Sequence, residues 1–251
     1  MSGHSKWATT KRQKAIVDAK KSSIFTKIGN LITIAARKGN DPTANFSLRL
    51  AIEKARVANL PKDNIERAIK RGTGELAGAQ IEELIYEGIG PAKTQFIIKC
   101  LTDNKNRSAA EVRHLFTKYG GSLGAVMWNF SQKGVLQITN YELPSSAKAL
   151  EDKRIANLEN DESFELELID NGAQDILKET EGMAVYTKPE DFQRVKLFLE
   201  NKKVKTESAE IEYIAKKQVN LTEEEKTQVQ KFIDELEDSE DVSDYYTNAN
   251  L

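Results

Sequence analysis

Cysteine and histidine are nearly absent from this 251-residue chain, which contains one cysteine and two histidines. A single cysteine excludes an intrachain disulfide, and Cys100 lies in an apolar run that predicts a buried, unreactive thiol. His4 and His114 are isolated from each other and from clustered carboxylates, so we expect no metal site and no cofactor. Because the usual catalytic constellations are missing, we predict that the protein is not an enzyme.

Long apolar runs are absent as well. No stretch approaches the roughly 20 apolar residues that a membrane helix needs. The first seven residues lack the apolar core of a secretory signal. No P-loop is present, and the glycines of residues 72–78 do not have the spacing of a dinucleotide fingerprint. We therefore expect a cytoplasmic protein with neither a membrane partner nor a small-molecule substrate.

Acidic residues are scarce in the first 74 residues, where 16 Lys and Arg face five acids and give a net charge of +11. The remaining 177 residues carry 21 bases and 34 acids, a net charge of −13. The total of −2 therefore conceals a basic module joined to an acidic body. This split indicates that the basic module binds a polyanion.

Helical periodicity dominates the basic module. Apolar residues follow one helical stripe within residues 23–37, a second stripe at Leu48, Ala51, Ile52 and Ala55, and a third at Ile65, Ala68 and Ile69. Glycine and proline separate these stripes. We predict a three-helix bundle, preceded by a partly helical basic arm over residues 5–21.

The acidic body shows a mixed pattern of strands and helices. Residues 72–80 read as a linker, and residues 86–91 as a turn cluster. Two β-α-β units are predicted to form one antiparallel sheet, with helices opened by capping boxes at Ser108 and Thr222. The expected strands of this sheet are 94–101, 126–130, 209–214 and 242–247.

A second α/β set interrupts this sheet. We expect strands at 134–139, 164–169 and 184–187, and helices at 146–160 and 189–200. The predicted fold class is α+β, an N-terminal three-helix bundle followed by two α/β (ferredoxin-like) domains, the third inserted into the second. The predicted domains are 1–74, 80–130 plus 207–251, and the inserted 131–206.

Bases in the first domain form the candidate nucleic-acid site. The excess of bases over acids is one-sided in this domain. Each phosphate that a base neutralises releases counterions, so such a surface would bind nucleic acid with steep salt dependence and little sequence preference. Trp7 lies among the bases and either stacks on a nucleobase or anchors the arm to the bundle. The candidate residues are Lys6, Trp7, Lys11, Arg12, Lys14, Lys20, Lys21, Lys27, Arg37, Lys38, Arg67, Lys70 and Arg71.

The segment 103–108 joins a predicted strand to a helix N-terminus. Its amides, its base and its free backbone N–H groups suggest a second RNA or phosphate contact at Asn104, Asn106 and Arg107. A polar turn with a helix cap explains the same residues equally well. No partner group is evident for Glu82, Glu83 and Glu87, on which a hydrolase would have to depend.

Several segments resemble the YebC family, which includes the mitochondrial translational activator of cytochrome oxidase. The matching residues are 3–8 (GHSKWA), Lys20, 24–27 (IFTK), 59–72 (NLPKDNIERAIKRG), 86–88 (YEG), 90–91 (GP), 101–104 (LTDN), 106–107 (NR) and 110–113 (AEVR).

The resemblance implies a helical N-terminal domain and two α/β domains, the third inserted in the second. It further implies a non-enzymatic regulator of gene expression that binds nucleic acid. The family's members are described as probable DNA-binding transcriptional regulators, and others as ribosome-associated translation factors that relieve stalling at consecutive prolines. DNA and ribosomal RNA, the latter on the ribosome, both remain candidate partners. A protein-interaction scaffold, or a hydrolase using the three glutamates, is the alternative.

Overall fold

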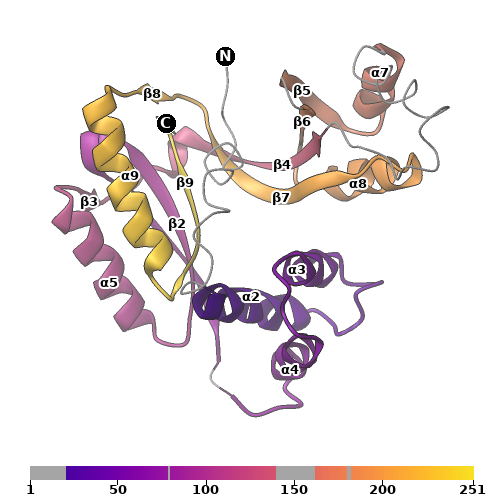
Figure 1. The fold of residues 1–251 in the computed structure, drawn as a ribbon, viewed down its shortest axis with the longest axis horizontal. Coiled ribbons are helices and arrows are strands. Elements are labelled where there is room, and N and C mark those ends of the chain that lie inside the picture. The colour runs from indigo at the N-terminus through magenta and orange to yellow at the C-terminus, as the bar shows by residue number, and fades with distance from the viewer. Residues whose placement is uncertain (1–20, 79, 140–161, 180–181) are drawn as a thin grey trace. The chain divides into compact units, whose positions relative to one another are not determined.

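The computed structural model describes residues 21–78, 80–139, 162–179 and 182–251, and the chain divides into two compact units. Unit 1 comprises residues 1–131 and 214–251, and unit 2 comprises residues 132–213. The fold is α+β, with helices first and sheet-containing parts after them, as the sequence predicts (Figure 1).

Three helices begin the described part of unit 1. They are α2 (Lys21–Ala36), α3 (Phe46–Val57) and α4 (Lys62–Gly72). The predicted stripe of α3 is confirmed, because Leu48, Ala51, Ile52 and Ala55 are all buried in the core between the helices. The buried amide of Asn45 fixes the turn between α2 and α3. Its oxygen accepts the N–H of Leu48 at 3.1 Å, and its nitrogen donates to the carbonyl of Ala35 at 2.8 Å.

The rest of unit 1 is a four-stranded antiparallel sheet of order β3-β1-β2-β9, with two helices on one face (Figure 1). Three aromatic rings lie at the centre of the core between that face and the helices. The ring centroids of Phe96 and Phe116 are 4.9 and 5.1 Å from that of Phe232. The elements are β1 (Glu82–Ile89), η2 (Pro91–Lys93), β2 (Gln95–Thr102), α5 (Lys105–Lys118), β3 (Ser122–Leu123), η3 (Met127–Asn129), β8 (Val219–Asn220), α9 (Glu223–Asp238), β9 (Val242–Thr247) and β10 (Ala249–Asn250).

The predicted turn cluster at 86–91 is mostly wrong, because β1 continues through it to Ile89. Gly88 serves close packing here and does not mark a turn. A Cβ at this position would lie 2.5 Å from the ring of Phe116 on α5. Only glycine lets the aromatic ring approach the strand this closely.

The predicted strand at 126–130 is wrong for most of its length. Residues Met127–Asn129 form the 3-10 turn η3, and β4 (Phe130–Thr139) begins after it. The carboxylate of Glu87 accepts the N–H groups of Val126 and Met127, each at 2.7 Å. These two donors therefore bond to a side chain in place of a neighbouring strand.

Helix α5 begins earlier than the Ser108 capping box predicts. Asn104 is the N-cap, and its side-chain oxygen accepts the N–H of Arg107 at 3.1 Å. Ser108 is instead buried within the helix. At α9 the prediction is confirmed, because Thr222 and Glu225 form a complete capping box.

Unit 2 has the β-α-β-β-α-β order of a ferredoxin-like fold. Its sheet has the order β5-β6-β4-β7, and β6 pairs antiparallel with both neighbours. The rings of Phe164 and Phe198 stack with centroids 6.2 Å apart and bring the two helices together. Besides β4, the elements are α7 (Glu162–Asp170), β5 (Ala173–Glu179), β6 (Gly182–Thr187), α8 (Phe192–Asn201) and β7 (Thr206–Ala215).

Two predictions about this region are corrected. The alternation in residues 164–169 predicts a strand, but these residues lie in α7, where Phe164 and Leu168 are buried one helical turn apart. The strand predicted at 209–214 exists as β7. It belongs to the sheet of unit 2, not to the sheet of β1 and β2. The helix predicted at 146–160 lies outside the described residues.

Candidate nucleic-acid interface

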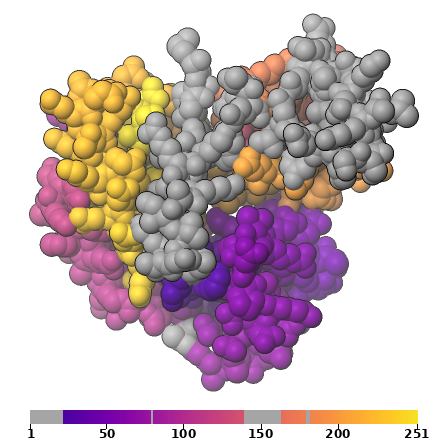
Figure 2. Space-filling view, viewed as in Figure 1, coloured from indigo at the N-terminus to yellow at the C-terminus, as the bar shows by residue number. Residues whose placement is uncertain are grey.

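The N-terminal arm lies outside the described residues, and with it Lys6, Trp7, Lys11, Arg12, Lys14 and Lys20. Lys21 is the first residue of α2. The described part of the predicted surface is therefore the bundle of α2, α3 and α4, which appears in indigo and violet in Figure 2. Residues 21–74 carry 11 bases and four acids, a net charge of +7. This excess makes the bundle basic even without the arm.

Two predicted contact residues bind other parts of unit 1. The ammonium of Lys27 donates to the carbonyl of Glu237 at the end of α9, at 2.6 Å. The guanidinium of Arg37 donates to the carbonyl of Ile81, just before β1. Both therefore help to hold the bundle on the sheet. Arg37 remains exposed, so its other N–H groups face solvent.

The C-terminal ends of α2 and α4 lie together. The hydroxyl of Thr33 donates to the carbonyl of Ala68 at 3.2 Å. A Cβ on Gly72 would lie 2.7 Å from the Cβ of Ala36. The bases at the two helix ends are thereby brought to the same region of the bundle. We call this set the α2–α4 cation cluster, made of Arg37, Lys38, Arg67, Lys70 and Arg71.

Few carboxylates oppose this cluster. Lys38, Arg67 and Lys70 are exposed, and within the part of the chain that the structure describes they have no ion-pair partner. Arg67 and Lys70 are three residues apart on α4 and so point to the same side. Glu66 on the same helix lies 3.6 Å from Lys62 and is partly neutralised by it. The cluster thus presents several unmatched positive charges to solvent.

Sequence reasoning missed two further arginines of the bundle. Arg56 is exposed in the last turn of α3. Arg49 lies over the ring of Phe46, 5.0 Å from its centroid, and its Nε and one Nη are buried without a hydrogen-bond partner. The sequence shows that both residues are basic and that both lie outside the apolar stripe of their helix. No other sequence signal could have marked them as part of the surface.

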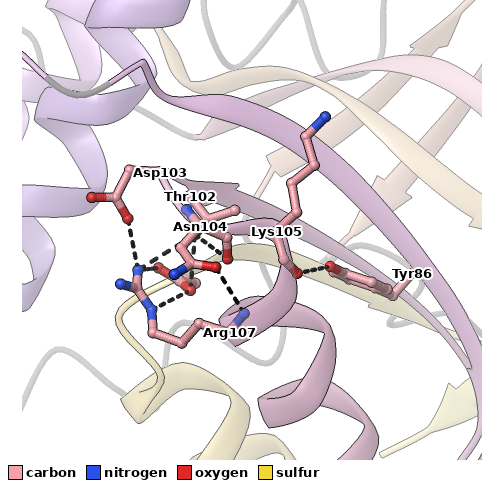
Figure 3. Close-up of polar contacts among 7 residues, drawn as sticks. Tyr86, Thr102, Asp103, Asn104, Lys105 and Arg107 are labelled. Atoms are coloured by element: carbon pink, nitrogen blue, oxygen red, sulfur yellow. Dashed lines mark hydrogen bonds and ion pairs between the residues drawn. The ribbon is translucent and has the colours of Figure 1, made fainter.

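The junction between β2 and α5 uses its polar side chains internally (Figure 3). Arg107 donates to both carboxylate oxygens of Asp241, at 2.9 and 3.3 Å, and to Asp103 at 3.0 Å. Asp241 also accepts the hydroxyl of Thr102 at 3.1 Å. Asn104 caps the helix, as described above, and Asn106 is exposed.

These contacts favour the helix-cap interpretation of the junction. Asp241 is the first cause of the raised pKa of Arg107, with Asp103 adding to it, so its positive charge is balanced within the protein. A phosphate would have to compete with two carboxylates for Nε and one Nη, while the other Nη makes no hydrogen bond within the described residues. Asn104 and Arg107 therefore have structural roles in the protein, and the phosphate contact predicted at this junction stays a prediction.

The three glutamates considered for hydrolysis each have a structural partner. Glu82 pairs with Lys105 at 2.7 Å and Glu83 with Lys99 at 3.1 Å, while Glu87 accepts the two backbone N–H groups of η3. Adjacent strand residues also point to opposite faces, which separates Glu82 from Glu83. This arrangement offers no paired acid and base.

Cys100 is buried in the core, as predicted, and burial raises the pKa of its thiol to about 12. The residues that the structure describes contain no group of three potential metal ligands. Within the same residues, no helix is long and apolar enough to cross a membrane.

Comparison with known proteins accounts for the whole chain. The model of the TACO1/YebC protein N-terminal domain matches residues 5–75, and that of the TACO1/YebC second and third domain matches residues 81–249. A probable transcriptional regulatory protein of Thermoanaerobacter pseudethanolicus is 44% identical, over 100% of this chain and 98% of the relative. One from Thermotoga maritima is also 44% identical, over 100% and 94%.

A solved structure agrees with these matches. The crystal structure of a conserved hypothetical protein from Aquifex aeolicus superposes with a TM-score of 0.79 and 38% identity, covering 98% of this chain and 97% of that chain. Family models and relatives extend over both the basic and the acidic parts, so the chain belongs to the TACO1/YebC family.

Proposed function

We propose that this protein is a non-enzymatic, nucleic-acid-binding regulator of gene expression whose basic bundle and arm contact backbone phosphates. The observation that carries the proposal is the α2–α4 cation cluster, in which every base but the half-buried Arg71 is exposed and few carboxylates oppose them. Like charges held together repel one another, and a polyanion relieves this repulsion. The names of the relatives, probable transcriptional regulatory proteins, agree with such a role.

Phosphate contact explains the cluster better than base readout does. Lysine and arginine on helix ends reach phosphates without regard to sequence, whereas specific readout needs a set of side chains at base edges in a groove. The acidic remainder, at −13, would be repelled by phosphate, so most phosphate contacts should lie on the basic end.

Two targets satisfy this chemistry, duplex DNA and structured RNA on the ribosome. We favour RNA on the ribosome and a role in translation, because binding through phosphates alone does not select a DNA site. A transcription regulator should instead bind a particular DNA sequence about 10³-fold or more tightly than other DNA. Sedimentation with ribosomes, in competition with genomic DNA, would separate the two targets.

Charge reversal within the cluster tests the proposal itself. In the double variant Arg67→Glu and Lys70→Glu, two exposed side chains of α4 change sign without a change in the core. The matched control reverses Arg113 on α5 and Lys231 on α9, which are also exposed and helical, and it changes the net charge by the same amount.

We expect the cluster variant to bind ribosomes and DNA more weakly than the parent. For duplex DNA, the slope of log affinity against log salt is negative and should become less negative by about 2. Each lost phosphate contact removes roughly 0.9 from its magnitude. The control variant should bind as the parent does. Equal affinity and equal salt slope for the parent and the cluster variant would show that the cluster does not contact nucleic acid.

A further inference from the structure

A large aromatic side chain is exposed on the acidic body. The indole of Trp128, in η3, is 63% exposed, while its neighbours Val126, Asn129 and Phe130 are buried. The other exposed residues on the same segment, Ser122 and Ala125 among them, are small or polar. Within residues 122–131, all of which the structure describes, Trp128 is therefore the only exposed large apolar side chain.

The turn that carries Trp128 is fixed to the sheet on both sides. The Glu87 carboxylate on β1 holds the N–H groups that precede the tryptophan. On the other side, the side-chain nitrogen of Asn129 donates to the side-chain oxygen of Gln95 at 2.6 Å and to the carbonyl of Lys217 at 3.0 Å. The side-chain oxygen of Asn129 accepts the backbone N–H of Lys217 at 3.0 Å. These hydrogen bonds fix the backbone that carries the indole, so a ligand that stacks on it has little backbone ordering entropy to overcome.

Lysines adjoin this turn, in contrast to the excess of acids in the rest of the acidic body. The ammonium of Lys216 donates to the Trp128 carbonyl at 2.9 Å, and Lys217 follows directly. The three adjoining segments, residues 90–95, 122–131 and 214–221, contain three lysines and no acid. Glu87, the nearby carboxylate on β1, is engaged by backbone N–H groups.

From this arrangement we infer that Trp128, Lys216 and Lys217 form a platform for single-stranded nucleic acid. A nucleobase would stack on the indole, and the two lysines would contact the flanking phosphates. The platform extends the proposed function and rests on it, since it adds a second contact far along the chain from the basic bundle. Bases inside a duplex are already stacked on their neighbours, so the platform selects unpaired nucleotides.

A labelled single-stranded RNA of about 12 nucleotides, within the span that single-strand binders cover, provides the probe. It carries 2-aminopurine, whose fluorescence falls when the base stacks, and its duplex with the complementary strand serves as the second ligand. The full chain is compared with Trp128→Ala, Trp128→Phe and Lys217→Ala. Leu166→Ala is the matched control, because Leu166 on α7 is 61% exposed and equally apolar.

Trp128→Ala should weaken single-strand binding about 5- to 100-fold, the range that base–aromatic stacking supplies, and abolish the fluorescence change. Trp128→Phe should keep much of the affinity and of the fluorescence change. Lys217→Ala should reduce the magnitude of the slope of log affinity against log salt by roughly 0.7. Duplex binding should stay as in the parent for both Trp128 variants. Leu166→Ala should match the parent with both ligands, and thermal unfolding should be the same for all variants.

The outcomes separate the platform from the proposed function. If the parent binds neither ligand at low salt, the proposed function fails and the platform fails with it. If the parent binds both ligands and Trp128→Ala binds the single strand as tightly, with the same fluorescence change, the platform alone is refuted. Equal losses for single strand and duplex also refute it, because stacking on an unpaired base cannot produce them. Unchanged RNA binding would point to a protein as the ligand of Trp128.

Discussion

Removal of the Asp241 carboxylate tests whether Arg107 is a structural residue or a phosphate contact. Asp241 is 6% exposed and accepts hydrogen bonds from Thr102 and, twice, from Arg107. Hydrogen bonds to charged groups contribute about 1.5–3 kcal/mol each. The Arg107 side chain is 53% exposed, so water replaces part of what is lost and the contribution must be discounted.

With this discount we expect Asp241→Ala to lower the free energy of unfolding by about 2–3 kcal/mol. Arg107→Ala should cost about 2 kcal/mol, because it leaves the buried carboxylate with Thr102 alone. The double variant should cost less than the sum of the two, with a coupling energy of about 1–2 kcal/mol. Arg107→Lys should recover only part of the stability, since lysine lacks the two-pronged fork that meets both oxygens.

Urea unfolding of the parent and the four variants, followed by circular dichroism, gives these free energies directly, provided that the m-values agree. A parallel RNA-binding titration checks the functional side, where Arg107→Ala should bind as the parent does. A coupling energy indistinguishable from zero would refute the structural interpretation. If Arg107→Ala also bound RNA more weakly at unchanged stability, the junction would have to be reassigned to nucleic acid.

Three other predictions concern packing, capping and pH. Gly72→Ala should destabilise the bundle by about 1–3 kcal/mol, because the added Cβ would overlap the Thr33 carbonyl oxygen of α2, and urea unfolding measures the loss. Thr222→Ala should cost about 0.5–2 kcal/mol by removing the cap of α9, whereas Thr222→Ser should restore most of the stability. The hydrogen bond from Tyr119 to Glu235 is the main cause that raises the pKa of Tyr119 from 10.0 to about 12. Folding therefore favours the neutral phenol, and its stabilisation is complete below pH 10 and lost as the pH rises through 12. Tyr119→Phe should remove this part of the alkaline loss in unfolding free energy, and an unchanged pH profile would count against it.

Local sequence determined the helices of the N-terminal bundle well. The stripe of Leu48, Ala51, Ile52 and Ala55 is buried as predicted, because a 3.6-residue period leaves one face for the core. The Thr222 capping box also forms, since it depends only on residues three apart. Signals of this kind are contained within one turn of backbone and need no distant partner.

Strands were harder to predict because their partners are distant. The sequence around Gly88 of β1 predicts a turn, but in the structure this glycine makes room for the ring of Phe116 on α5. The alternation in 164–169 suggested a strand, but burial of Phe164 and Leu168 makes it a helix. Nothing within residues 209–214 indicates which of two sheets the strand joins. That choice follows from pairing with β4, about 75 residues earlier in the chain.

For the candidate site, the sequence by itself determined the separation of charge, the identity of the bases and the family resemblance. Only the tertiary structure decided which bases remain available. It engages Lys27 and Arg107 within the protein, brings the ends of α2 and α4 together, and exposes Trp128 beside two lysines. The reason is physical. Charge is a property of each residue, whereas exposure and pairing depend on neighbours that the fold brings from far along the chain.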